Sequence, residues 1–354
     1  MEKPIRIGII GTGGMAGSHA DSYHKISGVE IVSCYDVDAE RAAAFAAKHK
    51  VGSVAVSAAE VIERSDAISI ATSDRFHAEY SIQTLNAGKH LLCEKPLTLT
   101  LADAEAVGEA AKAAQDNGVI HMVNFSYRSS AALQEAIALA KTGFFGEIRH
   151  VHGSYLQSWL NNDFQSASMS YGALWRLSTP MGSQGVLGDL GCHLLDLTTA
   201  STDDVTAIRC ELRTWQKKVD GAWSPSINGH PLDANDTAII EFELSGGGVG
   251  VCHTTRWATG CGNRIQLEVH GTEGALRFDI EKDATAIELW QANAKGDKAW
   301  VTKTLDPTPN NWERFITSIR TGEQDQPDIF RGVRVQAYLD ACERSAASGQ
   351  WVNV

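Results

Sequence analysis

With 354 residues and an apolar content of 43%, the chain is long enough to form two domains that each bury a core. Its formal net charge of −12 and its lack of a Lys/Arg cluster argue against a nucleic-acid-binding protein. No apolar run approaches the roughly 20 residues that a membrane helix requires, so we expect no membrane partner.

The cysteine pattern and the N-terminus indicate a cellular location. Seven cysteines without a CxxC pair fit a reducing compartment, and the first predicted strand begins too early to leave room for a signal peptide. We therefore expect a cytoplasmic protein. Cys252, His253 and Cys261 lie close in sequence but lack the spacing of a zinc site, so no metal is expected.

The first apolar run leads into a glycine-rich segment. Between a predicted strand at 6–10 and a predicted helix at 18–26 stands a match to G-x-G-x-x-G/A, made of Gly11, Thr12, Gly13, Gly14, Met15 and Ala16. Gly11 allows a tight turn, Gly13 lets backbone approach a pyrophosphate, and Ala16 is small enough for the helix to pack on the strand. Free N–H groups at the start of the helix would bind the phosphates.

An acidic residue ends the next predicted strand. The strand at 30–35 is followed by Asp36, about 20 residues after Ala16, where the dinucleotide motif places its ligand for the ribose hydroxyls. A carboxylate at this position repels a 2′-phosphate, so NAD is the predicted cofactor. Arg41 stands nearby and leaves the use of NADP possible.

Further strands and helices alternate through the first half, which predicts a parallel, doubly wound sheet of the Rossmann type. A strand at 67–71 places Ala71 and Thr72 at the ligand edge of this sheet, where we expect them to contact the cofactor. His77, at the start of the next helix, either contacts the cofactor or caps and packs that helix, and the sequence leaves both interpretations open.

The apolar run 90–93 ends in Glu94-Lys95-Pro96. Pro96 cannot donate a hydrogen bond to a sheet, so the strand must stop there. Ligands of such sheets bind outside the carboxyl ends of the strands, where the Lys95 ammonium could donate to a reacting oxygen. On its own the tripeptide could be an ordinary surface strand end, but the glycine loop before it favours a site.

The second half of the chain has a different pattern, and we predict a dinucleotide-binding domain at 1–127 and a substrate-binding and oligomerisation domain at 128–354. Hairpin signals at 245–248 and 271–274, followed by two terminal helices, indicate an α+β domain with a largely antiparallel open sheet. One face of such a sheet needs cover, so oligomerisation through this sheet is expected. The segment 161–184 is predicted to be a functional loop or lid.

The segment 188–197 contains three titratable side chains. If it opens a helix, Asp189, His193 and Asp196 share one face at i, i+4 and i+7, with Asp189 at the helix N-terminus. An Asp–His pair one turn apart can orient an imidazole as a general base. The alternative is a capped amphipathic helix with a hydrogen-bonded structural histidine.

Taken together, these segments resemble the glucose–fructose oxidoreductase, inositol dehydrogenase and rhizopine-catabolism (Gfo/Idh/MocA) family over nearly the whole chain. The resemblance rests on the glycine loop with His19, on Glu94-Lys95-Pro96, on 188–193 with Asp196, and on the tail 332–354. It implies a Rossmann domain, a C-terminal domain whose sheet mediates dimers or tetramers, and NAD(P)-linked oxidation of a sugar, anhydrosugar or cyclitol.

The resemblance also implies catalytic roles. Lys95 corresponds to the catalytic lysine, Asp189 to the substrate-binding acid and His193 to the acid/base, and both Lys95 and His193 would contact the substrate between the two domains. Two alternatives stay open, of which only the first would use the same lysine and histidine. The chain could be a redox glycosidase that oxidises its sugar transiently with tightly held NAD, or a sensor that binds NAD without turnover.

Further residues are assigned less directly by the same resemblance. Arg128 stands where the family often has a basic residue near cofactor and substrate, and Trp175-Arg176 resembles a pair that some sugar-oxidising members place beside the cofactor. Glu94 is grouped with the cofactor-binding residues. Trp159 could supply a flat apolar wall for a sugar ring or could belong to the core.

Overall fold

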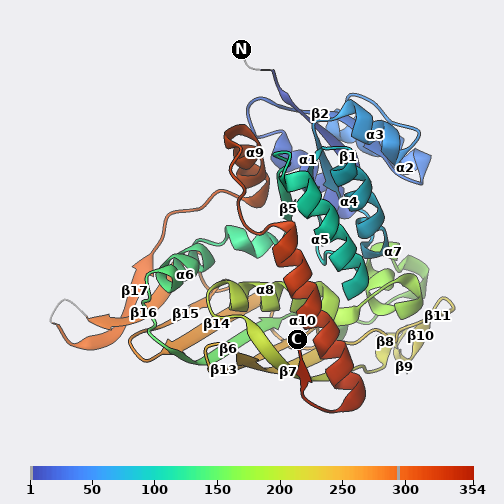
Figure 1. The fold of residues 1–354 in the computed structure, drawn as a ribbon. Coiled ribbons are helices and arrows are strands. Elements are labelled where there is room, and N and C mark those ends of the chain that lie inside the picture. Colours follow the sequence, from blue (N-terminus) through green and yellow to red (C-terminus); the bar gives the residue numbers. More distant parts are fainter. Residues whose placement is uncertain (1–2, 293–295) are drawn as a thin grey trace. The chain divides into compact units, whose positions relative to one another are not determined.

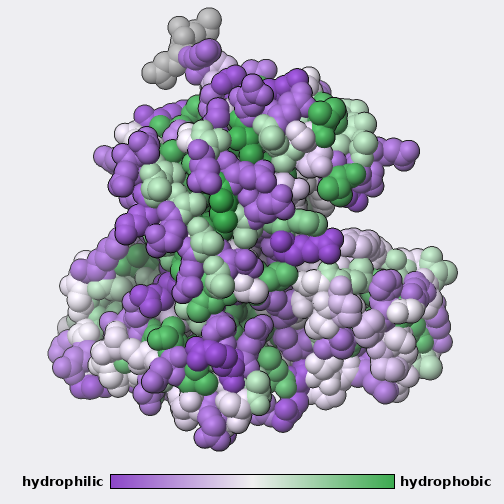
Figure 2. Space-filling view, turned by 45° about the vertical axis from the view of Figure 1, so that its right-hand side comes forward, coloured by the Kyte–Doolittle hydropathy of each residue, from purple (hydrophilic) through white to green (hydrophobic). Residues whose placement is uncertain are grey.

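The computed structural model describes residues 3–292 and 296–354, which divide into two compact units. Among the described residues, the first unit contains 3–126 and 309–336, and the second contains 127–292, 296–308 and 337–354. Figure 1 shows the elements of both in chain order. No described helix is long and apolar enough to cross a membrane. On the face shown in Figure 2, hydrophilic and hydrophobic residues are interspersed.

A five-stranded parallel sheet forms the centre of the first unit, in the order β2-β1-β3-β4-β5. Its strands are β1 (Ile5–Ile10), β2 (Val29–Tyr35), β3 (Ala67–Ile70), β4 (His90–Cys93) and β5 (His121–Val123). Val54 adds a parallel bridge to Cys34 at the outer edge of β2. Counting this bridge as a strand gives the spatial order of a Rossmann sheet, which confirms the predicted fold. The topological switch point of the sheet lies between β1 and β3.

The helices of the first unit differ in how they begin, and four of them start at a capping side chain. They are α1 (Gly14–Tyr23), α2 (Ala39–His49), α3 (Ala58–Arg64), η1 (Asp74–Phe76), α4 (His77–Asn86), α5 (Leu101–Gln115) and α9 (Asn311–Thr321). The side chains of Asp38, Ser57, Thr100 and Asn310 accept backbone N–H bonds at the starts of α2, α3, α5 and α9.

The helix α9 returns to the first unit, although the sequence analysis placed all of 128–354 in the second domain. Phe315 and Ile316 are fully buried and share a core with Ile7 and Ile9 of β1. An amphipathic helix after a long excursion can cover either sheet, so its pattern alone does not indicate which one.

The second unit is built on a nine-stranded sheet in the order β17-β16-β15-β14-β6-β13-β12-β7-β18. The strands are β6 (Ile148–Leu156), β7 (Val205–Arg213), β12 (Thr237–Leu244), β13 (Val249–Thr255), β14 (Arg264–Gly271), β15 (Ala275–Asp279), β16 (Ala286–Ala292), β17 (Lys298–Thr304) and β18 (Val352–Asn353). Among the described strands of this sheet, only β6 and β13 pair in parallel, and both predicted hairpins are present. The predicted α+β fold with a largely antiparallel sheet is therefore confirmed.

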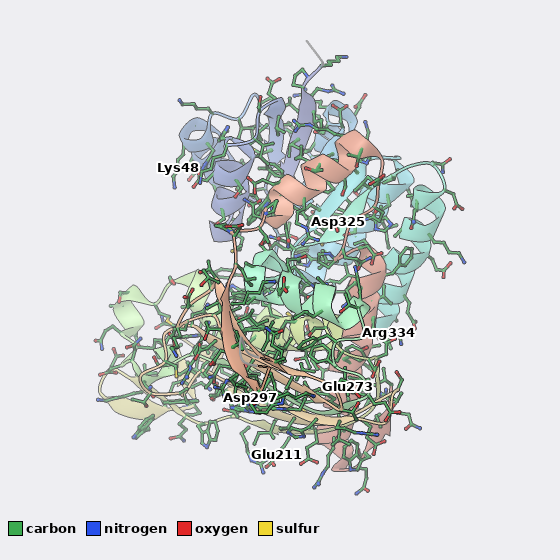
Figure 3. The ribbon with its side chains drawn as sticks, turned by 90° about the vertical axis from the view of Figure 1, so that its left-hand side faces the viewer. Lys48, Glu211, Glu273, Asp297, Asp325 and Arg334 are labelled. Carbon is green, nitrogen blue, oxygen red and sulfur yellow. The ribbon has the colours of Figure 1, made fainter. Side chains whose placement is uncertain are left out.

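Helices of the second unit cover one face of this sheet. They are α6 (Ala131–Lys141), α8 (Cys192–Ala200) and the later part of α10 (Ile329–Ser348), and η2 (Ser126–Ser129) precedes α6. α8 packs on β6 and β13, and α6 packs on β16. Glu211 of β7 lies on the side of the sheet away from α6 (Figure 3), and the strand β12 alternates buried and exposed residues, as a half-covered sheet requires.

The segment 161–184 has more secondary structure than the sequence predicted, and its role as a functional loop or lid stays a prediction. It consists of short helical turns, η3 (Trp159–Asn161), η4 (Ser166–Ser168), α7 (Tyr171–Leu174), η5 (Trp175–Leu177) and η6 (Thr179–Met181). Two small ribbons, β8 (Lys217–Val219) with β9 (Ala222–Ser224) and β10 (Ser226–Ile227) with β11 (His230–Pro231), complete this region. Leu174 and Leu177 share a small core with Val219, Ile227 and Leu232, which gives the segment a fixed packing.

Candidate active site

The glycine loop at the carboxyl end of β1 has room for a pyrophosphate. Gly11 has a φ of +87°, and a Cβ there would lie 2.7 Å from backbone atoms of Ala71 and Thr72, so only glycine fits. No atom lies within 4 Å of the positions that a Cβ would occupy on Gly13 and Gly14. α1 starts at Gly14 without a side-chain cap, which leaves its first N–H groups available to an anion.

The Asp36 carboxylate lies directly beside this loop. It accepts hydrogen bonds from the Thr12 N–H at 2.8 Å and the Thr12 hydroxyl at 2.9 Å, and from Arg41 Nε at 3.1 Å. Burial raises the pKa of Asp36, but hydrogen bonds from Arg41, from the Asp38 N–H and from Thr12 outweigh it and hold the pKa at about 2. These contacts hold Asp36 as an anion beside the glycine loop.

Glu94 belongs to a buried hydrogen-bond network. Its Oε1 lies 2.8 Å from His19 Nε2 and accepts from Asn124 Nδ2 at 2.6 Å. Burial raises the pKa of Glu94, but hydrogen bonds from His19 and Asn124 and the charges of His19 and Lys95 outweigh it and hold the pKa at about 2. The Lys95 N–H donates to Glu94 Oε2 at 3.3 Å. These contacts fix the turn that carries Lys95, and the predicted contact between Glu94 and the cofactor stays a prediction.

His77 joins two loops at the ligand edge of the sheet. The ring is fully buried, with Nδ1 2.8 Å from the Pro96 carbonyl oxygen and Nε2 3.3 Å from that of Thr72. Burial lowers the pKa of His77, but Cys93, Asp74 and the Pro96 carbonyl outweigh it and raise the pKa to about 10. Both ring nitrogens lie within hydrogen-bond distance of backbone carbonyl oxygens, which favours the packing interpretation over a cofactor contact.

In the second unit, Asp189 lies in the π-helical turn η7 (Leu187–Gly191), which continues into α8. Asp189 is in the first turn of this element, close to the helix N-terminus that the sequence analysis expected. Asn235 supplies the cap from far along the chain, because its Oδ1 accepts from the Leu187 N–H at 2.9 Å and its carbonyl accepts from Val186 at 2.8 Å. π-helical turns occur frequently at functional sites.

Two guanidinium groups hold the Asp189 carboxylate. Arg256, which follows β13, donates from Nη2 to Asp189 Oδ2 at 2.7 Å, and Arg176 Nε lies 3.6 Å from the same oxygen. The Arg176 guanidinium also lies over the Trp175 ring, 4.8 Å from its centre. The structure thus brings Arg176 to Asp189, whereas the resemblance grouped it with the cofactor. Sequence reasoning missed Arg256, because no local motif marks it.

His193 lies against two tyrosines. Its ring centre is 4.9 Å from that of Tyr127 and 6.3 Å from that of Tyr155. The two phenol oxygens are 2.7 Å apart, and Tyr155 also donates to Asn263 at 2.8 Å. Burial, Tyr127 and the charge of Asp189 raise the pKa of Tyr155, so this phenol stays neutral. Tyr127, Tyr155 and Asn263 carried no sequence signal of a site.

Two further predicted residues are engaged inside the second unit. Arg128 forms a bidentate pair with Asp196, with two N–O distances of 2.7 Å, and both side chains are buried. Trp159 has the Arg256 guanidinium 5.2 Å from its ring centre and donates from Nε1 to Gln157 at 3.0 Å. These contacts favour a packing role for Trp159, and its role as a sugar platform stays a prediction.

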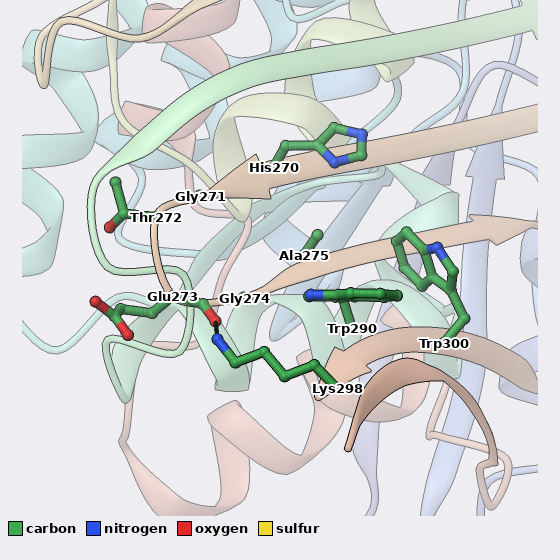
Figure 4. A pocket seen from close by; sticks show the side chains of 9 residues that line it. All are labelled: His270, Gly271, Thr272, Glu273, Gly274, Ala275, Trp290, Lys298 and Trp300. Atoms are coloured by element: carbon green, nitrogen blue, oxygen red, sulfur yellow. Dashed lines mark hydrogen bonds between the residues drawn. The ribbon is translucent and has the colours of Figure 1, made fainter. Parts of the chain in front are cut away.

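A separate pocket of about 350 Å³ opens between the loop 271–274 and the ends of β16 and β17, as Figure 4 shows. None of the predicted site residues lines it. Its lining residues are His270, Gly271, Thr272, Glu273, Gly274, Ala275, Trp290, Lys298 and Trp300.

Two family models match the chain. One, described as an oxidoreductase family with an NAD-binding Rossmann fold, matches residues 5–125, and the GFO/IDH/MocA C-terminal domain matches residues 133–277. Levoglucosan dehydrogenase from Pseudarthrobacter phenanthrenivorans is 29% identical over 81% of this chain and 79% of its own length. The 1,5-anhydro-D-fructose reductase of Ensifer adhaerens is 30% identical over 98% of this chain and 97% of its own.

A solved structure is similar to this chain over its whole length. A levoglucosan dehydrogenase in complex with NADH and L-sorbose is similar to this chain with a TM-score of 0.86 and 26% identity. The similarity covers 100% of this chain and 99% of that one.

Proposed function

The chain belongs to the GFO/IDH/MocA family of NAD-binding oxidoreductases, and we propose that it reversibly oxidises one secondary hydroxyl of a sugar, anhydrosugar or cyclitol. The observation that carries this proposal is a helical segment of the second unit. There Asp189, a carboxylate held by two guanidinium groups, precedes the imidazole of His193 by about one turn. Alcohol oxidation requires a group that fixes the substrate hydroxyls and a general base, and these two residue types can supply those roles.

NAD, when bound, supplies the hydride acceptor of the reaction. The residues of the first unit fit it, since the open space above Gly13 and Gly14 and the uncapped start of α1 suit its pyrophosphate. Asp36 would accept from the ribose hydroxyls, because its carboxylate is ionised and lies at the loop.

The proposed proton chemistry uses three side chains. An imidazole nitrogen of His193 takes the proton of the substrate hydroxyl as the hydride leaves the carbon that bears this hydroxyl. Lys95 Nζ donates a hydrogen bond to that oxygen and stabilises its developing negative charge. Asp189 accepts from a neighbouring hydroxyl and so orients the ring. Each acid/base contribution is expected to be on the order of 10²–10⁴ in rate.

The substrate class is supported by the relatives, whose names include a levoglucosan dehydrogenase, a 1,5-anhydro-D-fructose reductase and an inositol 2-dehydrogenase. Self-association belongs to the same proposal. The half-covered sheet of the second unit supports a homodimer or homotetramer, and light scattering of the purified protein would measure its state.

The test is to incubate the protein with NAD and a panel of inositols, hexoses, anhydrosugars and glycosides, and to follow nicotinamide absorbance. Net reduction with one stereochemical group of polyols supports the proposal. Release of free sugar from a glycoside without net reduction would replace it with the redox glycosidase. Binding of NAD with neither reaction on any member of the panel would favour the sensor.

A further inference from the structure

We propose that Arg256 is the positioning residue of the candidate site, and that it fixes Asp189 as a hydroxyl acceptor and leaves proton transfer to His193. This role rests on the proposed function, in which Asp189 binds the substrate. It assigns a role to a residue that no sequence motif marks.

The guanidinium of Arg256 is enclosed on several sides. The residue is fully buried, and its Nη2 donates to Asp189 Oδ2 at 2.7 Å. Its Nη1 donates to the Arg176 carbonyl oxygen at 3.1 Å, and its Cζ lies 5.2 Å from the centre of the Trp159 ring. Two hydrogen bonds and an aromatic face leave the guanidinium plane little freedom, so the carboxylate oxygen that it holds has a defined position.

The backbone of Arg256 is equally fixed. Its N–H donates to the Asp236 carbonyl at 3.1 Å, and its own carbonyl accepts from the Leu160 N–H at 3.2 Å. Asp236 in turn forms a fully buried ion pair with Lys217 at 2.7 Å, and the Lys217 ammonium also donates to the Trp215 carbonyl at 2.8 Å. The backbone of Arg256 is thus hydrogen-bonded to a residue of a buried ion pair. If Asp189 were displaced, Arg256 could not move with it.

Charge explains why Asp189 acts as an acceptor. A guanidinium stays protonated when it is buried, and a buried cation that lacks a counter-anion is strongly destabilising. Arg256 therefore requires the negative charge of Asp189, and the half-buried Arg176 at 3.6 Å adds to this requirement. A carboxylate kept anionic in this way accepts hydrogen bonds, so the proton must go to another group, and His193 is in the same helix.

The kinetic test compares R256M and R256K with the wild-type protein on the best polyol of the panel. We expect R256M to lower kcat/KM roughly 100-fold, mainly through a higher KM, with unchanged affinity for NADH. R256K keeps the charge and should recover kcat/KM to within about tenfold of wild type. The control R277M removes a half-exposed ion pair with Glu288 on the same sheet and should change neither constant. A wild-type KM in R256M would overturn the proposal.

A second readout does not depend on activity. The thermal midpoints of R256M, D189N and the double variant are compared, because paired buried charges are not additive. We expect the double variant to be more stable than the sum of the single losses predicts, and additive losses would overturn the proposal. Should R256M fail to fold, the same cycle is run with R256Q, which also removes the charge but keeps a polar side chain. A wild-type protein inactive on every polyol would refute the proposed function, whereas this cycle tests the Arg256–Asp189 coupling by itself.

Discussion

His19 Nε2 lies 2.8 Å from Glu94 Oε1, with both side chains buried in the first unit. The pair joins α1, which starts at the glycine loop, to the turn that carries Lys95. His19 Nδ1 lies 2.6 Å from the Ser69 hydroxyl of β3, and Asn124 donates to the same Glu94 oxygen. The groups expected to bind the pyrophosphate and to act on the substrate are therefore fixed to one another through buried hydrogen bonds.

Replacing Glu94 by glutamine should reveal this network in the pH dependence of stability. The pKa of Glu94 is lowered from 4.5 to about 2, so its stabilising effect is complete above pH 4.5 and is lost as the pH falls through 2. We expect the free energy of unfolding of E94Q to be about 3 kcal/mol lower than that of wild type at pH 7. This difference between the two proteins should narrow below pH 4.5. Urea unfolding from pH 7 to pH 3 measures this gap. E79Q, at an exposed site, is the control, and a constant gap for E94Q would contradict the account.

The two glycines of the loop should respond differently to alanine. In G11A the new methyl group meets the Ala71 backbone at 2.7 Å with φ at +87°, so stability should fall by roughly 1–3 kcal/mol. In G13A the methyl group meets no atom within 4 Å. G13A should therefore unfold like wild type yet bind NADH at least about tenfold more weakly, because the methyl group occupies the pyrophosphate space. Thermal unfolding and fluorescence titration with NADH separate the two effects, and wild-type binding by G13A would place the pyrophosphate elsewhere.

Removal of the Asp36 carboxylate should change the choice of cofactor. We expect D36A to weaken NADH binding roughly 10- to 100-fold, since it removes hydrogen bonds to a charged acceptor. The preference of the protein for NADH over NADPH should therefore become smaller. The same substitution removes one of the two carboxylates paired with Arg41, whose Nε now lies 3.1 Å from Asp36, so that its guanidinium can turn to a 2′-phosphate. Titration with both reduced cofactors tests this, with E40A as the matched control. Unchanged affinities in D36A would mean that the ribose lies elsewhere.

Lys95 should affect turnover more than binding. Replacement by alanine removes the ammonium expected at the reacting oxygen, so kcat should fall by roughly 10²–10⁴. Affinity for NADH should stay within about twofold of wild type. Steady-state kinetics and NADH titration of K95A, with the exposed-site variant K112A beside it, separate the two quantities. Loss of NADH binding in K95A would instead make Lys95 a phosphate ligand.

His193 should set the pH dependence of the rate. An imidazole ordinarily titrates near neutral pH, so a wild-type kcat/KM profile that rises through this range reports the general base. In H193N we expect a slower rate without this rise. Profiles from pH 5 to pH 9 test the assignment, and H150N, at an exposed site of the same unit, should keep the wild-type shape. A retained rise in H193N would assign the base to another group.

Local motifs explain what the sequence could predict. Gly11, Gly13 and Asp36 follow consecutive strands at short spacing, so the dinucleotide loop and the order of strands were accessible from the sequence. The same holds for Lys95, because Pro96 ends its strand. Each of these inferences needs only neighbouring residues and the rule that ligands bind at the carboxyl ends of parallel strands.

Contacts between distant segments explain what it could not predict. Asn235 caps the helix before Asp189, and Arg256 reaches Asp189 from the end of β13, so neither the π-helical turn nor the ion pair has a local signal. The same reason applies to two further features. α9 packs on the first unit because Phe315 is buried in its core, and the segment 161–184 is ordered because Leu174 and Leu177 pack against distant residues of the second unit.

The most direct test of the central claim follows one hydrogen atom. Sugars, anhydrosugars and cyclitols deuterated at every ring carbon are incubated with the protein and NAD, and the nicotinamide is analysed by mass spectrometry. The account predicts that one deuterium per turnover appears in the reduced nicotinamide, together with a ketone at the former carbinol carbon. Nicotinamide that stays unlabelled and oxidised, in a protein that binds NAD, would contradict it.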